Sequence, residues 1–281
     1  MTEATSLPTL AILGIGSMGR AILEGLLDPA VTTDGPIRVT SRSAERIAEF
    51  ADSDAVTAVA TSEDPAANRK AVAGAKIVLI AVKPAMVADL LAEIAGDLEA
   101  DAVIVSVAAG VTIQSMASKL PHSVSVLRSM PNTPSRVGRG VTGLSAGEGV
   151  AADDLAAVTA LFATVGTVIP VPESQIDALS AISGSGPAYV FYFIEALETA
   201  ARERGFSDEQ AALLVGETFA GSIELLGASG QSARKLRRQV TSPNGTTERA
   251  IAAFDAGDIP KSILQGVDDA IARSKEIAAS M

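Results

Sequence analysis

The sequence contains no cysteine and no tryptophan, and histidine occurs once among its 281 residues. The absence of cysteine excludes disulfides, a cysteine nucleophile and metal sites built from thiolates. The single histidine, His122, follows Pro121 in a turn-like stretch, where a structural role is expected. No HExxH or Cys–His motif occurs and the carboxylates are scattered, so we expect no metal site.

Long hydrophobic runs and an excess of positive charge are also lacking. Apolar runs end near ten residues, as in 102–111, whereas a membrane-spanning helix needs about 18 or more. Residues 1–10 carry one acid and no basic cluster, which is not typical of a signal peptide. The formal net charge of −11 repels nucleic acid and anionic membranes. We therefore expect a cytoplasmic protein without nucleic-acid or membrane partners.

Residues 1–170 alternate between short β-branched segments and helix-like segments. Segments that are apolar on both faces indicate a buried parallel sheet, and the alternation indicates βαβ units. Strands are expected at 10–14, 37–41, 55–59, 76–82, 102–108, 124–129, 137–145 and 167–171. Helices are expected at 18–27, 43–51, 85–95, 112–119 and 151–164. The predicted fold class is α/β, with an N-terminal Rossmann-type doubly wound sheet over residues 1–170.

Residues 171–281 are predicted to form an all-helical domain. Helices are expected at 175–182, 187–204, 207–227, 232–239, 246–256 and 261–279. Helix 187–204 carries four of the nine aromatic residues, and these lie all round the helix, as in a helix that is buried on every side. Either the helical domain covers this helix within one chain, or a second subunit does. We favour a core shared by a dimer, because Gly216, Ala220 and Gly221 in the next helix allow backbones to approach closely.

A glycine-rich segment, Gly14-Ile15-Gly16-Ser17-Met18-Gly19, follows the first strand and opens a helix. In a dinucleotide-binding βαβ unit the first glycine permits the tight turn, the second lets a pyrophosphate approach the backbone, and the third lets helix and strand pack closely. The helix N-terminus adds free N–H groups and partial positive charge. The alternative is a glycine-rich turn that binds no ligand.

The end of the second expected strand favours a cofactor with a 2′-phosphate. An NAD-binding site would have an acidic residue there for the ribose hydroxyl. This chain has Ser41 and Arg42 instead, and Glu45 already lies within the expected helix. A hydroxyl and a guanidinium suit a phosphate. We therefore predict NADPH, with NADH possible; alternatively, Arg42 is an ordinary surface charge.

Other strand ends are expected to complete the cofactor site, because ligands of open α/β sheets bind beyond the carboxyl ends of the strands. Ala81, Val82, Lys83 and Pro84 follow one strand, and Ala108 lies at the end of the next. Lys83 is either an acid catalyst or, as we favour, a loop residue whose backbone lines the site. With other catalytic groups lacking, hydride transfer from a nicotinamide is the remaining chemistry.

Two loops of the helical half are followed directly by helices. Residues 183–189 read SGSGPAY, with a proline suited to a first helical position. Residues 241–247 read TSPNGTT, which offers hydroxyls, exposed amides and a helix N-terminus, a good cradle for a carboxylate. The alternative for the second loop is an ordinary capped turn.

Taken together, these segments resemble the pyrroline-5-carboxylate reductase family over nearly the whole chain. The likeness rests on the glycine motif, AVKP at 81–84, RSMPNTP at 128–134, SGSGPAY at 183–189 and TSPNGTT at 241–247, in the order and spacing of the family. The resemblance implies reduction of the C=N bond of 1-pyrroline-5-carboxylate by NAD(P)H to give L-proline. It also implies a homodimer built on the helical domain, often assembled into a decamer of five dimers.

The resemblance assigns roles to individual residues. The backbone from Gly14 to Gly19 would hold the pyrophosphate, and Ser41 and Arg42 would face the 2′-phosphate. Asn68 would contact the adenosine side, and Val82, Lys83 and Pro84 would line the nicotinamide ribose. Ser242, Gly245 and Thr246 would bind the substrate carboxylate, and Thr247 would place its hydroxyl on the ring nitrogen as the catalytic residue.

Some features leave other interpretations open. The family often has Gly or Ala where Asn244 stands, which leaves the exact shape of that loop undecided. The residues Arg234, Arg237 and Arg238 before the loop have no assigned role. A β-hydroxyacid dehydrogenase would need a lysine after the cofactor domain, and residues 175–230 contain none. A nucleotide-sensing protein with a relic cofactor site is the non-catalytic alternative.

Overall fold

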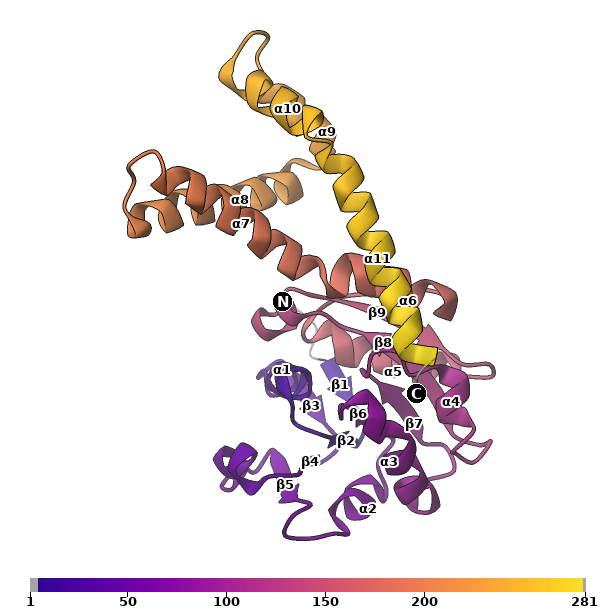
Figure 1. Ribbon diagram of the computed structural model, residues 1–281. Coiled ribbons are helices and arrows are strands. Elements are labelled where there is room, and N and C mark those ends of the chain that lie inside the picture. Colours follow the sequence, from indigo (N-terminus) through magenta and orange to yellow (C-terminus); the bar gives the residue numbers. More distant parts are fainter. Residues whose placement is uncertain (1–4, 280–281) are drawn as a thin grey trace. The chain divides into compact units, whose positions relative to one another are not determined.

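The computed structural model describes residues 5–279, with side chains to residue 276. An eight-stranded sheet has the order β10-β9-β8-β7-β6-β2-β4-β5 (Figure 1). Its strands are β2 Leu10–Leu13, β4 Ile37–Ser41, β5 Val56–Ala60, β6 Ile77–Ile80, β7 Val103–Ser106, β8 Ser125–Met130, β9 Gly140–Ala146 and β10 Gly166–Pro170. The six strands from β5 to β8 are parallel, and β9 runs antiparallel to β8. Strand β10 pairs parallel with β9.

Helices cover both faces of this sheet, as its doubly apolar strands require. The helices are α1 Ser17–Leu26, α2 Ala67–Val72, α3 Val87–Ile94, α4 Ile113–Ala117 and α5 Ala152–Ala163. On one face, alternate residues of β2 pack with α1 and α5 in a core that contains Ile12 and Phe162. On the other face, Leu13 packs with α2, α3 and α4. The predicted Rossmann-type α/β class is therefore confirmed.

The chain order places a topological switch point at the centre of the sheet. From β2 the chain moves outward to β4 and β5, and it then returns to β6 on the other side of β2. Open α/β sheets bind ligands beyond the strand ends at such a point. The glycine turn follows β2 and the AVKP segment follows β6, so both lie at this position.

The expected helix at 43–51 is wrong. Two 3-10 turns, η1 Ala44–Arg46 and η2 Ala48–Phe50, replace it. Ile47 between them has φ −119° and packs into the core, so burying this side chain interrupts the helical backbone. A small parallel pair, β1 Thr5–Leu7 with β3 Val31–Thr33, and the short α2 were not predicted from the sequence. Residues 1–4 of the segment judged unlike a signal peptide lie outside the described residues.

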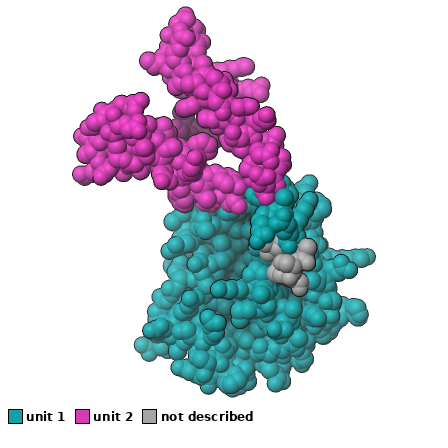
Figure 2. Space-filling view, viewed as in Figure 1, with its two compact units in different colours: residues 1–184, 270–281 teal, residues 185–269 magenta. Residues whose placement is uncertain are grey.

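The chain forms two compact units, shown in different colours in Figure 2. The first comprises residues 1–184 and 270–281, and the second residues 185–269. The first unit includes η6 Glu173–Gln175, α6 Ile176–Leu179 and a π-helical turn, Ser180–Gly184. These units differ in extent from the ranges 1–170 and 171–281 expected from the sequence, and the division of cofactor and substrate roles near residue 170 stays a prediction.

The second unit is helical, as predicted. It contains α7 Gly186–Arg202, α8 Asp208–Ser229, α9 Ala233–Gln239, α10 Thr246–Ala256 and the first part of α11 Ile259–Ala279. Helix α8 begins at a capping box in which the Ser207 side chain accepts from Gln210 N–H and the Gln210 side chain accepts in return. Helices α7 and α8 pack together but leave large apolar side chains exposed, among them Phe191, Tyr192, Leu213 and Ile223.

Candidate active site: cofactor cavity and carboxylate loop

The turn after β2 requires glycine at its first position. Gly14 has φ +100°, and its N–H donates to the Thr40 carbonyl oxygen at 3.0 Å. A Cβ placed there would lie 2.9 Å from the carbonyl carbon and oxygen of Ala81. The backbone of the AVKP segment therefore passes too close for any side chain at position 14.

The other two glycines of the turn have different environments. A Cβ at Gly19 would collide with the Gly14 carbonyl oxygen, so this residue lets α1 pack against the turn. A Cβ at Gly16 would meet nothing within 4 Å. Gly16 is also the N-cap of α1, without a side-chain cap and with no acid in the first turn. The helix N-terminus thus faces open space with unpaired N–H groups, which fits an anionic ligand such as a pyrophosphate.

A cavity of about 490 Å³ lies beyond the strand ends of the first unit. It brings together most of the residues predicted to bind the cofactor: Gly14, Ile15, Gly16, Ser41, Arg42, Asn68, Ala81, Val82 and Lys83. Sequence reasoning missed its other lining residues: Thr40, Ser43, Arg46, Thr61, Ala85, Met86, Asp89, Leu90 and Glu93. Asp89 and Glu93 could have been noticed, because their spacing of four places both on one face of α3.

Two arginines make one part of the cavity cationic. Arg42 and Arg46 are exposed, and neither forms an ion pair with a described residue. The neighbouring Arg20, in contrast, pairs with Glu49 and stacks on the Phe50 ring at 6.0 Å from its centroid. The buried Ser41 hydroxyl accepts from Ser43 N–H at 3.3 Å, which shapes the loop that carries Arg42. Free guanidinium groups beside a strand end suit a phosphate.

The amide of Asn68 has a fixed orientation in this cavity. Its Nδ2 donates to Glu93 Oε2 at 3.3 Å, and its Oδ1 accepts from the Thr40 hydroxyl at 2.7 Å. An ionised carboxylate can only accept, so Glu93 determines which end of the amide faces α3. The remaining N–H of Asn68 is left for a ligand oxygen, such as that of a ribose.

Four predicted cofactor residues line neither this cavity nor its neighbour. Ser17 lines the neighbouring cavity of about 330 Å³, which Ile15, Gly16 and Arg46 also line. The four are Met18, which packs on the core; Gly19, which supports the turn; Pro84, which begins η3; and Ala108, which is buried after β7. Their roles toward the cofactor stay predictions.

The TSPNGTT loop of the second unit forms a tight turn directly before α10. Asn244 takes the left-handed conformation with φ 58°, and Gly245 N–H donates to the Ser242 carbonyl oxygen at 3.0 Å. Gly245 is the N-cap of α10, and the N–H groups of Thr246 and Thr247 donate to no described residue. The left-handed conformation of Asn244 defines the shape of this loop, which the sequence left undecided. The turn therefore presents free amides and hydroxyls, which fits a carboxylate ligand.

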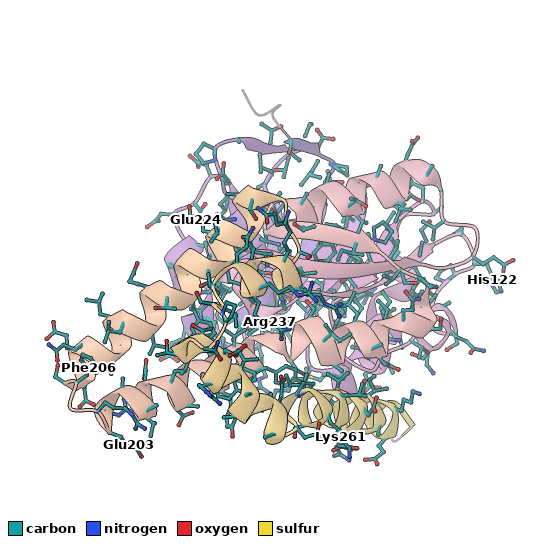
Figure 3. All side chains as sticks on the ribbon, turned by 90° about the horizontal axis from the view of Figure 1, so that it is seen from above. His122, Glu203, Phe206, Glu224, Arg237 and Lys261 are labelled. Atoms are coloured by element: carbon teal, nitrogen blue, oxygen red, sulfur yellow. The ribbon has the colours of Figure 1, made fainter. Side chains whose placement is uncertain are left out.

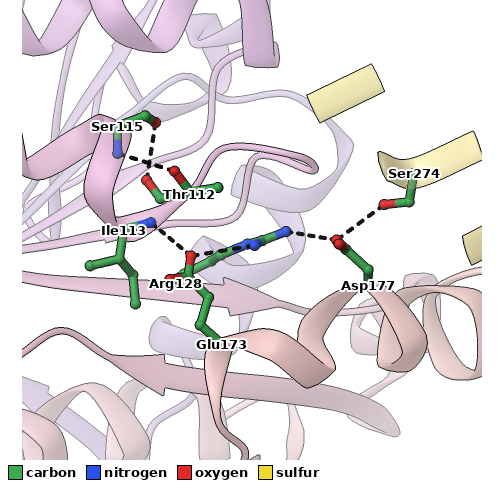
Figure 4. Close-up of polar contacts among 7 residues, drawn as sticks. All are labelled: Thr112, Ile113, Ser115, Arg128, Glu173, Asp177 and Ser274. Atoms are coloured by element: carbon green, nitrogen blue, oxygen red, sulfur yellow. Dashed lines mark hydrogen bonds and ion pairs between the residues drawn. The ribbon is translucent and has the colours of Figure 1, made fainter. Parts of the chain in front are cut away.

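The RSMPNTP segment joins the sheet to the helical turns that follow it in the first unit. Arg128 is 5% exposed and contacts Glu173 Oε1 at 3.4 Å and Asp177 Oδ1 at 3.1 Å (Figure 4). The same carboxylates also accept from Ile113 N–H at 2.8 Å and from the Ser274 hydroxyl at 3.2 Å. This part-buried network connects β8, α4, α6 and the end of α11.

Asn132 makes a second connection within the same segment. Its Nδ2 donates to both the carbonyl oxygen and the hydroxyl of Ser183 at 3.1 Å, and its Oδ1 accepts from Val141 N–H at 2.8 Å. The amide thus links the SGSGPAY segment to β9. The RSMPNTP segment therefore has a structural role, which could not be predicted from the sequence.

The single histidine does not line the cofactor cavity. His122 is exposed on an outer loop of the first unit and points away from it (Figure 3). Among the described residues, no group of three or more His, Asp or Glu side chains is placed to hold a metal ion. Arg237, also labelled in Figure 3, lies on α9 together with the exposed Arg234 and Arg238.

Comparison with known proteins identifies the family. Residues 173–277 match the family described as "Pyrroline-5-carboxylate reductase dimerisation", and residues 9–110 match "NADP oxidoreductase coenzyme F420-dependent". The Pyrroline-5-carboxylate reductase of Mycobacterium tuberculosis is 38% identical over 95% of this chain and 96% of its own length. The chain belongs to the pyrroline-5-carboxylate reductase family. It is accordingly an oxidoreductase of a family that makes proline.

Other reductases of the family agree in sequence and structure. Pyrroline-5-carboxylate reductase 2 of Bacillus subtilis is 33% identical over 95% of this chain and 94% of its own. The solved structure of the Coxiella burnetii reductase has a TM-score of 0.86 and 35% identity, and covers 95% of this chain and 97% of its own. A Plasmodium falciparum pyrroline carboxylate reductase with NADP bound has a TM-score of 0.82 at 25% identity over 96% of this chain and 98% of its own.

Family membership explains the exposed apolar face of the helical unit. Phe191 and Tyr192 on α7 and their exposed neighbours on α8 lie within residues 173–277, the range that matches the dimerisation family. This agrees with the predicted oligomer. Helix α8 is also long and apolar enough, by length and composition alone, to cross a membrane. A buried dimer core requires the same apolar composition.

Proposed function

We propose that this protein reduces 1-pyrroline-5-carboxylate to L-proline with NADPH as the hydride donor. The observation that carries the proposal is the TSPNGTT turn at the start of α10, with the free N–H groups of Thr246 and Thr247, in a chain that also has a dinucleotide cavity. When bound, NADPH supplies the hydride to the C=N bond. The chain itself then has to bind, orient and desolvate the two reactants.

The substrate side of the proposal rests on hydroxyls and amides. Ser242 and Thr246 bind the carboxylate through hydroxyl and N–H groups, which form charge-assisted hydrogen bonds. Gly245, whose own N–H donates to the Ser242 carbonyl oxygen, shapes the turn that presents them. Thr247, half-buried on the first turn of α10, places its hydroxyl at the ring nitrogen. A protonated imine is already electrophilic, so a group that orients it suffices and no strong acid is needed. This agrees with a loop that contains threonine and serine but no histidine.

Thr247→Ala is expected to lower kcat/KM for 1-pyrroline-5-carboxylate by about tenfold or more, because one hydrogen bond to the reacting ring is lost. The KM for NADPH should change by less than about twofold, since Thr247 belongs to the substrate loop. Steady-state kinetics with each substrate varied measures both. Thr247→Ser keeps the hydroxyl and should retain most activity; equal losses for both substrates would instead indicate a folding role.

The cofactor side rests on Arg42 and Arg46, the cations beside Ser41. Replacing either by alanine should raise the KM for NADPH by about tenfold, because a charge-assisted bond to the 2′-phosphate is removed, and should leave the KM for NADH nearly unchanged. Arg69→Ala is the matched control, since Arg69 pairs with Asp97 at 2.7 Å outside the cavity. Equal increases in the KM for NADPH and for NADH would show that the two arginines do not bind the 2′-phosphate.

The proposed assembly is a homodimer through α7 and α8, with association of five dimers into a decamer as the finer proposal. We further propose a cytoplasmic enzyme without membrane or nucleic-acid partners, in line with the net charge of −11. Light scattering of the purified protein distinguishes the dimer from the decamer.

A steady-state assay of 1-pyrroline-5-carboxylate with each cofactor tests the whole proposal. We expect turnover with both cofactors and a preference for NADPH. Oxidation of a hydroxy acid without turnover of the cyclic imine would favour a β-hydroxyacid dehydrogenase. Tight NADPH binding without turnover of any cyclic imine would favour a nucleotide-sensing protein.

A further inference from the structure

One glutamate in the first turn of α10, next to the loop proposed to bind the substrate carboxylate, has no role in the function proposed above. Glu248 is the third residue of α10, and its Oε2 accepts from the Asn244 N–H at 2.8 Å. Glu248 forms no ion pair with a described residue. Its carboxylate therefore places a negative charge next to a loop that is proposed to bind the substrate carboxylate. This charge lowers the affinity for the substrate unless the contact with Asn244 compensates for it.

The contact has such a use in the backbone of the turn. Asn244 is one of two described non-glycine residues with positive φ, at 58°. Left-handed backbone is unfavourable for most residues, and less so for asparagine. A hydrogen bond to the N–H of Asn244 favours this conformation over the extended alternatives. In the left-handed conformation the turn closes from Ser242 to Gly245 at 3.0 Å, and the next amides are left unpaired.

We infer that Glu248 is a positioning residue for the substrate loop: it holds Asn244 in the left-handed conformation, so that the free amides of Thr246 and Thr247 are arranged for the carboxylate before substrate binds. The inference rests on the proposed function of that loop. A loop that populates its binding-competent form only part of the time binds with proportionally lower affinity. The charge of Glu248 is not needed for this task; only its acceptor oxygen is.

Glu248→Ala is therefore expected to raise the KM for 1-pyrroline-5-carboxylate by about five- to tenfold, with kcat and the KM for NADPH within about twofold of wild type. Glu248→Gln keeps an acceptor oxygen and removes the charge, so it should match the wild-type KM or fall below it. Thermal melting of all variants, at one protein concentration, controls for folding. If Glu248 had a purely structural role, its replacement would lower the melting temperature and weaken the binding of 1-pyrroline-5-carboxylate and of NADPH together. Glu248→Gln and Glu248→Ala would then have the same effect.

A second background tests whether Glu248 acts through Asn244. Glycine adopts positive φ without a Cβ penalty. In an Asn244→Gly background, the loop depends less on the hydrogen bond to Glu248. The additional effect of Glu248→Ala on the KM for 1-pyrroline-5-carboxylate should therefore shrink to about twofold or less. An equal effect in both backgrounds, or a wild-type KM for Glu248→Ala, would overturn the inference.

The same experiments separate this inference from the proposed function. If Thr247→Ala impairs turnover while Glu248→Ala does not, the loop binds substrate but Glu248 does not position it. If the wild-type protein does not reduce the cyclic imine, or if Thr247→Ala is without effect, the proposed role of the loop itself fails.

Discussion

Gly14→Ala should both destabilise the first unit and reduce NADPH affinity by at least about a hundredfold. At φ +100° a residue with a side chain is strained, which costs roughly 1–3 kcal/mol. The new Cβ would also lie 2.9 Å from the backbone of Ala81 and 3.0 Å from Val82 Cγ1, an overpacking cost of roughly 1–3 kcal/mol. Relief of the clash moves the turn away from β6, and the pyrophosphate site moves with it.

Gly16→Ala separates the two effects. Its φ of −71° suits alanine, and a Cβ there meets no atom within 4 Å, so the free energy of unfolding should stay within about 0.5 kcal/mol of wild type. NADPH affinity should still fall, because the methyl group occupies space through which the pyrophosphate approaches the backbone. Urea denaturation and titration of NADPH fluorescence measure the two quantities. Undiminished NADPH affinity in Gly16→Ala would contradict the cofactor site.

Arg128→Met should lower the free energy of unfolding by about 3 kcal/mol, the lower end of the cost of removing one partner from a buried ion pair, because the carboxylates left behind are partly exposed. The Arg128 side chain is 6% exposed, and its loss leaves Glu173 and Asp177 without their cation. The β8 strand would then lose its ion pair with Asp177 of α6, the residue that also accepts from Ser274 near the end of α11. Methionine keeps the apolar length of the side chain, so the change isolates the charge and its hydrogen bonds.

A surface pair provides the control for this change. Arg69→Met removes a guanidinium that contacts Asp97 at 2.7 Å but is 56% exposed, and exposed pairs contribute only about 0.2–1 kcal/mol. Urea denaturation at one fixed protein concentration is the measurement, since an oligomer is stabilised by its own association. Similar losses of unfolding free energy in Arg128→Met and Arg69→Met would show that the Arg128 network contributes no more to stability than an exposed ion pair.

The sheet and the cofactor cavity could be predicted largely because local patterns determine them. Apolar β-branched runs reveal the parallel strands, and the carboxyl ends of parallel strands meet at one edge, which brings Gly14 and Ala81 together. One of the cavity residues missed in the sequence, Arg46, lies where a pattern misled. A regular helix over 43–51 left Arg46 unremarked, whereas burial of Ile47 breaks that segment into two 3-10 turns.

Contacts between distant residues could not be predicted from local patterns. The partners of Arg128 lie 45 and 49 residues further along the chain, and Thr40 meets Asn68 across 28 residues. The loop before α10 was expected from its residue types, but its shape was not. That shape depends on the hydrogen bond from Asn244 to Glu248, which a single sequence does not reveal.

We propose that the cofactor cavity and the loop at 242–247 act on one pair of reactants. A crystal structure of the protein with NADP⁺ and L-proline bound tests it most directly. We expect the proline carboxylate on the amides of Thr246 and Thr247, the Thr247 hydroxyl at the ring nitrogen, and the nicotinamide ring against the proline carbon that carries the hydride. A structure in which residues 242–247 lie remote from the nicotinamide in every pairing of subunits would contradict it.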